Sequence, residues 1–368
     1  MAFSGANMPQ HLDSDINDLP LVKEIRNREI KRFNNILLIV YEAYANYETI
    51  LHYGSDNSKQ LAFLEDKGFH IYHSVYTLGT PTTAAMSRLF NLDQSLIDRK
   101  YPAGGGAVQN LLRKIGYESH SIFSSDYMFR NLTSEQISCD NPFPPLRNEA
   151  LTMIDVIIQG EFSDELSFAD VGYETYLERK NEVLTGKHHS PLIMYSHSPL
   201  PGHGPSGQGV DPEESPKYMD RYTTEWLPKA NDEMRQDVNL VLENNPDAIV
   251  IIAGDHGPFL TKDGYGLNRR GNFEAEDIDR YDLQDRFGAF LAIRWPKSDY
   301  ATIHDIKILQ DIFPAVFAYL YDDESLFDLL RMERITLSNQ RTLGVKVDNG
   351  IIVGGKHDGE PLFLYTQD

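Results

Sequence analysis

The chain has 368 residues, with 55 acidic against 34 basic side chains and a formal net charge of −21. Hydrophobic residues make up 41% of it and charged residues 24%, which is ordinary for a globular protein with a sizeable core. The acidic balance argues against nucleic acid or an anionic membrane as a partner, because both require clustered Lys and Arg. It still permits a phosphorylated substrate, because a bound metal ion supplies local positive charge.

Cysteine usage and the hydropathy pattern bear on the compartment. Cys139 is the single cysteine, so no intramolecular disulfide can form, which fits a reducing compartment. No run of about 18 apolar residues is present, so no transmembrane segment is expected. The first residues lack the features of a signal peptide. We expect a soluble protein, cytoplasmic if this is the full chain and periplasmic or extracellular if it is a domain cut from a membrane-anchored parent. The oligomeric state is not predicted.

Apolar runs of strand length alternate with helical segments along the chain. Such runs, buried on both faces, are typical of a parallel sheet. The expected strands are 36–40, 68–75, 116–123, 191–196, 249–254 and 287–295. The expected helices are 58–67, 108–114, 162–182, 218–244 and 304–320, with a further surface helix within 19–33. The pattern predicts an α/β fold with a mostly parallel central sheet and helices on both faces. The segment 342–353, with Asp348-Asn349-Gly350 at its turn, predicts a small C-terminal β-hairpin.

Two of these strands end in residues that can bind a metal. The run 249–254 ends in Gly254 and is followed by Asp255, His256 and Gly257, and the run 36–40 is followed closely by Glu42. Ligands of open α/β sheets bind at the carboxyl edge, and carboxylates and imidazoles are zinc ligands. Two other interpretations stay open: Asp-His-Gly also suits a turn, and Glu42 also suits the first turn of a helix.

Hydroxyls and further histidines occur at two other strand ends. Thr82 and Thr83 follow Pro81 at an expected helix start, where backbone N–H groups favour a bound anion. An ordinary threonine N-cap is the alternative. His197 and His203 lie in the Gly- and Pro-rich segment after the run 191–196, which we expect to be a loop. Loop histidines are either functional or simply solvated.

The order of these four features resembles that of the alkaline phosphatase superfamily. The similarity is to the branch of sulfatase-like, phosphoethanolamine transferase and lipoteichoic-acid-synthase-like proteins, and it covers residues 34 to about 320. It rests on a strand followed by Glu42, on Gly-Thr-Pro-Thr-Thr at 79–83, on His-Gly-Pro at 203–205, and on a strand followed by Asp255-His256-Gly257.

The resemblance implies a metal site and a nucleophile. It implies that Glu42, Thr82, Asp255 and His256 bind one divalent ion, most often zinc, with Mn and Ca as alternatives. It further implies that Thr82 is the nucleophile, with Thr83 as the other candidate. His203 would act on the substrate as a catalytic residue. His197, His203 and Thr83 would contact the substrate.

The sequence departs from that family in two places. The Cys (or Ser) of the sulfatase motif Cys-x-Pro-x-Arg is replaced by Gly79, which argues for phosphoryl rather than sulfate chemistry. The histidine that many members carry about a dozen residues after Asp-His-Gly is missing, so a complete second metal site is not expected.

We therefore expect a metal-dependent phosphoryl-group transferase or phosphoesterase that acts through a covalent phosphothreonine. Its substrate would be a glycan- or lipid-linked phosphoester of the phosphoethanolamine or phosphoglycerol type. The alternatives are a sulfatase-like hydrolase and a non-catalytic glycan- or phosphate-binding module. We expect an N-terminal extension at 1–33, a catalytic domain at 34–325, and a C-terminal extension at 326–368 packed on the same domain.

Overall fold

The structure is a computed structural model. It describes residues 28–92, 105–125, 171–188, 190–204, 213–262, 273–337 and 342–364, together with residues 23, 25 and 128. The expected surface helix within 19–33 and the first half of the expected helix at 162–182 lie largely outside the described residues. Among the described helices, none combines the length and the apolar character needed to cross a membrane.

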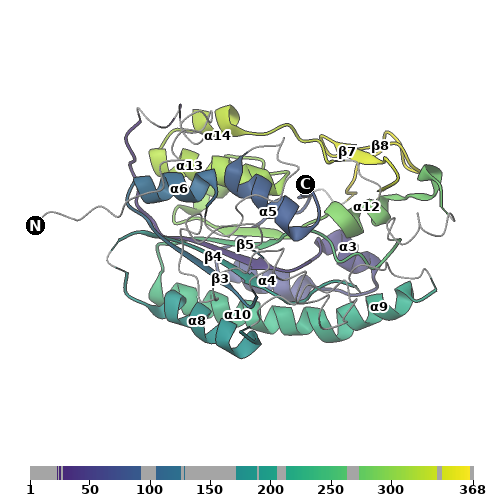
Figure 1. Cartoon of the computed structure of the whole chain (residues 1–368), viewed down its shortest axis with the longest axis horizontal. Helices are drawn as coiled ribbons and strands as arrows, with labels where there is room; N and C mark the ends of the chain where they lie inside the picture. The colour runs from purple at the N-terminus through teal and green to yellow at the C-terminus, as the bar shows by residue number, and fades with distance from the viewer. Residues whose placement is uncertain are drawn as a thin grey trace, which may run out of the picture.

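The described strands form a mixed six-stranded sheet at the centre of the molecule (Figure 1). They lie in the order β2-β6-β5-β1-β4-β3. Their bounds are β1 Ile36–Tyr41, β2 His70–Ile71, β3 Glu118–Phe123, β4 Leu192–Ser198, β5 Ile249–Gly254 and β6 Leu291–Arg294. β1, β3, β4 and β5 pair in parallel, whereas β6 runs antiparallel to β5 and to β2. The expectation of a mostly parallel sheet is confirmed.

The central strand β1 sets the register of the sheet. All six of its residues are buried, as expected for a parallel strand covered on both faces. Tyr41, its last residue, lies opposite Ser198 of β4 on one side and Gly254 of β5 on the other. The residues that follow β1 and β5 therefore emerge side by side at the carboxyl edge of the sheet, where β4 also ends.

Helices cover both faces of the sheet (Figure 1). One layer consists of α5 Thr82–Asn91, α6 Ala107–Lys114, α13 Ile312–Tyr321 and α14 Ser325–Leu330. The other consists of α3 Tyr47–His52, α4 Ser58–Asp66, α8 Tyr173–Thr185, α9 Ser215–Arg221 and α10 Leu227–Asn244, the last two joined by a π-helical segment at Tyr222–Trp226. Alternate residues of β1 face the two layers, so Leu38 packs into one apolar cluster and Leu37 into the other.

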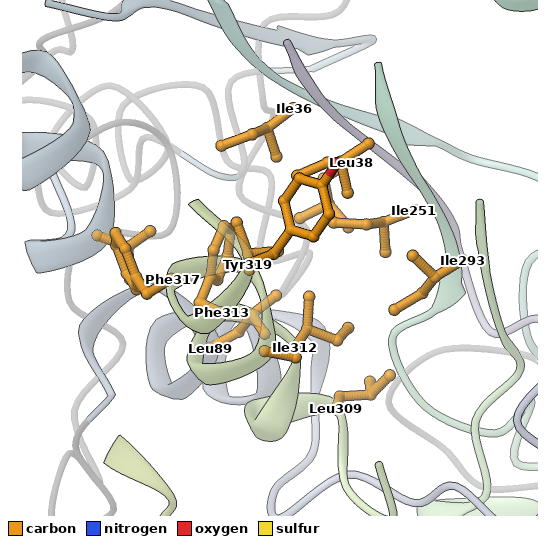
Figure 2. Close-up of a cluster of buried hydrophobic side chains, with 14 of the residues drawn as sticks. Ile36, Leu38, Leu89, Ile251, Ile293, Leu309, Ile312, Phe313, Phe317 and Tyr319 are labelled. Atoms are coloured by element: carbon orange, nitrogen blue, oxygen red, sulfur yellow. The ribbon is translucent and has the colours of Figure 1, made fainter. Parts of the chain in front are cut away.

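The first apolar cluster anchors α13 to the sheet (Figure 2). The helix sequence IFPAVFAYLY is apolar on every side, which is typical of a fully enclosed helix. Its Phe313 and Phe317 belong to the same cluster as Leu38 and Ile251 of the sheet. Each such side chain contributes about 1.5–3 kcal/mol when fully buried, so this layer gives the sheet a rigid support.

The expected C-terminal hairpin is present. β7 (Lys346–Asp348) and β8 (Ile351–Val353) pair antiparallel around Asn349 and Gly350, which adopt φ values of 50° and 81°. Asn-Gly is the preferred pair for this turn because both positions require positive φ. The hairpin packs through Val347 and Ile352 against a cluster that includes residues of α12 (Arg280–Phe287).

Three boundaries differ from the sequence expectations. The strand expected at 68–75 is only the two-residue β2, because the chain then leaves the sheet and Tyr76 bridges to Gly288 and Ile308. The same bridge keeps the residues around Ile308 extended, so the helix expected from residue 304 begins as a 3-10 turn at Leu309. His197 was expected in a loop, but β4 continues to Ser198, so His197 is a strand residue.

Candidate metal centre

Three segments bring potential ligands together at the carboxyl edge of the sheet. Glu42 directly follows β1, Asp255 and His256 directly follow β5, and Thr82 is the first residue of α5. Gly254 is required at the end of β5, because a Cβ there would lie 2.1 Å from the carbonyl oxygen of Tyr44. A glycine is needed equally after His256, since a Cβ at position 257 would lie 2.1 Å from a backbone oxygen of α12.

The four side chains form a compact set of donor atoms. Thr82 Oγ1 lies 3.0 Å from Glu42 Oε1 and 3.0 Å from His256 Nε2. His256 Nε2 lies 3.5 Å from Glu42 Oε1 and 3.1 Å from Asp255 Oδ2. Ligands that are each about 2.0–2.1 Å from one tetrahedral zinc lie roughly 3.3 Å from one another. The observed spacings match that arrangement.

The groups around these donors leave their ligand atoms available. The backbone N–H of Ala43 donates to Asp255 Oδ1 over 2.8 Å. Asp255 Oδ2 is buried and has no hydrogen-bond partner among the described residues. His256 Nδ1 lies 2.8 Å from the carbonyl oxygen of Gly257, so its N–H donates there and the Nε2 lone pair faces the cluster. An unpaired buried carboxylate oxygen is costly, and a bound cation would compensate it. The residues present therefore fit a divalent metal.

His197 lies beside this cluster and orients Glu42. Its Nε2 donates to Glu42 Oε2 over 2.8 Å, and its Nδ1 lies 2.8 Å from the hydroxyl of Tyr195. Glu42 thus presents Oε1 to Thr82 and holds His197 with Oε2. Potential ligand atoms of Glu42, His197 and Asp255 also lie within 4.8 Å of one another, so the imidazole belongs to the same centre.

The Glu42–His197 pair is arranged as an ion pair. Burial alone would raise the pKa of Glu42, but the hydrogen bond and charge of His197 lower it below the usual range. Burial alone would lower the pKa of His197, but its hydrogen bond to Glu42 and the charge of Asp255 raise it. Glu42 is therefore an anionic ligand at neutral pH.

His203 faces the same centre from the loop after β4. Its Nδ1 lies 2.8 Å from the carbonyl oxygen of Gly204, and its Nε2 lies 3.8 Å from Glu42 Oε1. The side chain is 31% exposed, the most accessible of the histidines here. It borders a cavity of about 450 Å³ that is also lined by Glu42 and His197 and by residues after β3, among them Ser124 and Ser125.

The structure thus gathers Glu42, Thr82 and Asp255 around His256, with His197 and His203 beside them. Thr83 lies one residue further along α5, and its buried hydroxyl has no hydrogen-bond partner among the described residues.

Sequence reasoning missed the residues that support the ligands. Phe259 stacks on the ring of His256, with centroids 4.7 Å apart and planes 8° apart. The guanidinium of Arg286 lies 4.4 Å from the centroid of the Phe259 ring. Tyr195 holds His197, and Ala43 contributes only its backbone N–H. The closeness of Phe259 to the Asp-His pair was the single sequence signal available; the remaining contacts join segments far apart in the chain.

Comparison with known proteins bears on the fold. No protein-family model matches the sequence, and no curated protein matches it. Among solved structures, the C-terminal periplasmic domain of EcEptC from Escherichia coli, in complex with Zn, superimposes with a TM-score of 0.53 and 14% identity, over 88% of this chain and 95% of that one. The yidJ protein from Bacteroides fragilis gives a TM-score of 0.51 and 12% identity over 88% of each chain.

Both neighbours belong to the alkaline phosphatase superfamily. The fold of this chain is alkaline-phosphatase-like. The expected resemblance is confirmed at the level of the fold, with helices on both faces of the sheet and a separate hairpin. At these identities the likeness extends to the fold alone, so the chemistry rests on the donor cluster of this chain.

Proposed function

We propose that this protein is a metal-dependent phosphoryl transferase or phosphoesterase that forms a covalent intermediate on Thr82. One observation carries the proposal. The hydroxyl of Thr82 lies 3.0 Å from both Glu42 Oε1 and His256 Nε2, in a cluster where a buried oxygen of Asp255 lacks a partner. An unactivated threonine is a poor nucleophile, and this arrangement provides for its activation.

Glu42, Thr82, Asp255 and His256 are the residues proposed to hold the metal. Three oxygen donors and one imidazole nitrogen in a four-donor set favour zinc; Mn is the alternative, and Ca is less suited because it takes six to eight oxygen ligands. When bound, a dication lowers the pKa of a coordinated hydroxyl and neutralises charge on phosphoryl oxygens.

The chain's own residues would divide the reaction between them. Thr82 Oγ1 gives up its proton to solvent and attacks phosphorus, and the bond to the leaving oxygen breaks as the Oγ1–P bond forms. His203, which borders the cavity, donates a proton to that leaving oxygen. Water or an acceptor hydroxyl then attacks the phosphothreonine and frees Thr82. His197 keeps Glu42 ionised and oriented throughout.

The cavity next to the cluster supports a phosphodiester with an organic substituent. Its volume of about 450 Å³ lies within the range of small-molecule sites. Ser124 and Ser125 provide polar groups, and Phe123 and Met128 provide apolar surface. This lining suits a phosphoethanolamine or phosphoglycerol donor carried on a glycan or lipid. His197 reaches the cavity wall and is retained as a contact to substrate alongside its role towards Glu42.

The nucleophile is tested with bis(4-nitrophenyl) phosphate as the probe. Zinc-loaded wild type should release nitrophenol, and mass spectrometry with fragmentation should locate a nitrophenyl phosphoryl group on Thr82. Thr82→Ala should abolish both signals while keeping the zinc content of the protein above half. Thr83→Ala is the matched control, because it removes the neighbouring buried hydroxyl, and it should retain the adduct.

Other outcomes would identify the alternatives. An adduct on Thr83, or turnover unchanged in Thr82→Ala, contradicts the assignment of the nucleophile. A protein that binds zinc or inorganic phosphate but never turns over would be a binding module. Sulfatase activity is disfavoured by the glycine at position 79, whose Cβ would lie 2.5 Å from the guanidinium of buried Arg88. Hydrolysis of nitrophenyl sulfate exceeding that of the phosphodiester would reverse this preference.

A further inference from the structure

A second group of potential metal ligands lies at the opposite, amino edge of the sheet. Glu118 is the first residue of β3, His120 lies two residues further on the same strand, and His188 lies in the connection between α8 and β4. Ligand atoms of the three side chains all lie within 4.8 Å of one another. None of them takes part in the site described above.

The geometry is close to that of a metal site. Glu118 Oε2 lies 3.9 Å from His120 Nε2 and 4.0 Å from His188 Nδ1. Three ligands at about 2.0–2.2 Å from one zinc would lie roughly 3.3 Å apart. The ligand atoms of His120 and His188 lie within 4.8 Å of each other, so the three pair distances need to shorten by roughly 0.6 to 1.5 Å to place the three side chains on one ion. Their exposure, at 46%, 25% and 13% of each side chain, leaves a path for the metal and a position for water.

The tautomer of His188 is a second observation that indicates a ligand. Its Nε2 lies 2.9 Å from the carbonyl oxygen of Val183, in the last turn of α8, so the Nε2–H donates there. That bond leaves the Nδ1 lone pair facing Glu118. Metal-bound histidines characteristically donate their other N–H to a carbonyl or carboxylate in this way. A histidine that only capped the helix would not need its free nitrogen directed at a carboxylate and a second imidazole.

The backbone holds the two ligand segments together. The N–H of Glu118 donates to the carbonyl oxygen of Pro191 over 2.9 Å, which links the start of β3 to the end of the connection that carries His188. Glu118 and His120 share one face of β3 because side chains alternate along a strand. Ile122, next on that face, belongs to the same apolar cluster as Leu184 of α8. The site is thus built on rigid elements.

We propose that Glu118, His120 and His188 form a second binding site for a transition-metal dication, with zinc as the expected ion. Two imidazoles and one carboxylate are borderline donors that suit zinc, copper or nickel rather than calcium or magnesium. The net charge of −21 raises the local concentration of cations. Glu118 and His197 lie five residues apart in register along neighbouring strands, or roughly 16 Å, so the two sites are separate.

Zinc bound there would join β3 to the connection between α8 and β4. The ion stabilises the folded chain, because the unfolded chain does not hold the three ligands together. Its role is therefore structural in this proposal, and it is independent of phosphoryl chemistry.

The experiment counts metal in full-length protein whose first site has been removed by Asp255→Asn and His256→Gln. After dialysis against buffered zinc, this background should retain one zinc equivalent, with a rise in thermal midpoint on zinc addition. Adding His120→Gln should weaken zinc binding by at least about tenfold, since loss of even an outer-shell partner costs 10–100-fold. This variant keeps the bond from His188 to α8 and so preserves the fold.

His188→Gln should give the same loss, measured as Co²⁺ absorption as well as zinc content. His357→Gln is the matched control, because His357 also lies beside a carboxylate, Glu360, at 3.1 Å but has no third donor in the group. It should leave zinc binding unchanged. A background protein that retains no zinc, or that binds zinc equally well after His120→Gln and His188→Gln, overturns the proposal. Neither result affects the proposed function at Thr82, which is tested in protein with an intact first site.

Discussion

Two buried charged clusters lie next to each other at the ends of β1 and β4, and they are constructed in opposite ways. In one, the ammonium group of Lys180 binds Glu233 and Asp237 of α10. Tyr41 donates to Asp237 over 2.6 Å, and Ser198 donates to Glu233 over 2.8 Å. This cluster carries its own cation and donors, so it needs no ligand.

The other cluster, at the proposed metal centre, uses the residues adjacent in sequence to Tyr41 and Ser198. Glu42 follows Tyr41, and His197 precedes Ser198. Here the carboxylates of Glu42 and Asp255 face His197, whose pKa they raise, and an oxygen of Asp255 is left unpaired. The difference teaches that burial of charge alone does not mark a functional site. The informative feature is a buried charge that the protein leaves uncompensated.

Loss of the Lys180 ammonium group should destabilise the fold more than any other change predicted here. We expect Lys180→Met to lower the free energy of unfolding by about 3–5 kcal/mol, because it leaves two buried carboxylates with hydroxyl donors but without a counter-ion. Denaturant unfolding with and without zinc measures this, and the loss should be equal in both. Combining it with Glu233→Gln and Asp237→Asn should recover most of the stability. A loss below about 1 kcal/mol would show that water compensates these carboxylates.

The stability of the metal centre, unlike that of the Lys180 cluster, should depend on added zinc. Removing zinc with a chelator should lower the stability of wild type by about 4 kcal/mol relative to protein at a thousandfold excess over its dissociation constant. Asp255→Asn should abolish this zinc-dependent part and leave the metal-free protein about as stable as wild type, because it removes an unpaired buried charge. Thermal unfolding of both proteins, with and without chelator, measures the effect. Marked destabilisation of metal-free Asp255→Asn would contradict the comparison.

Acid titration should distinguish the clusters further. Burial and the charge of Glu233 raise the pKa of Asp237 to about 6, although Lys180 opposes the shift. Because this pKa is higher than in the unfolded chain, the folded protein binds the proton more tightly. Protonation of Asp237 therefore adds to the free energy of unfolding. This contribution is at most about 3 kcal/mol, is fully present below about pH 4, and is lost as the pH rises through about 6.

Denaturant unfolding between pH 4 and 7 checks that sign. Wild type should lose stability relative to Asp237→Asn as the pH rises, whereas Asp232→Asn, at an exposed position of the same helix, should follow wild type. A difference that moves in the opposite direction would show that Lys180 dominates the titration of Asp237.

The smallest expected effect concerns the support of His256. Phe259→Leu removes the ring that stacks between His256 and Arg286. We expect a loss of about 0.5–1 kcal/mol, or roughly two- to fivefold in zinc affinity and turnover. Phe63→Leu is the control, because it removes a similar ring beneath Arg235 on the opposite side of the sheet from α5. An equal effect on zinc affinity in both variants would exclude a specific role for the stack.

Much of the fold was readable from local pattern. The strands β1, β3 and β5 were predicted at 36–40, 116–123 and 249–254, because each is an apolar or alternating run between turn signals. The Asn-Gly hairpin was predicted from the φ values that its turn requires. The expected strand at 68–75 was wrong because its length is limited by pairing with β6 and by the bridges of Tyr76, which join distant segments.

The sequence by itself determined which side chains follow the central strands, because a buried run followed by Glu42 or by Asp255-His256 can end only at the carboxyl edge of a parallel sheet. Only the tertiary structure decided what these side chains face. The register of the sheet placed Tyr41 between Ser198 and Gly254. The tertiary fold then set the Thr82 hydroxyl and the Asp255 carboxylate around His256. Next to them, it enclosed Lys180 with its own counter-ions. Pairing of this kind depends on long-range contacts, and no local pattern encodes which buried charge stays uncompensated.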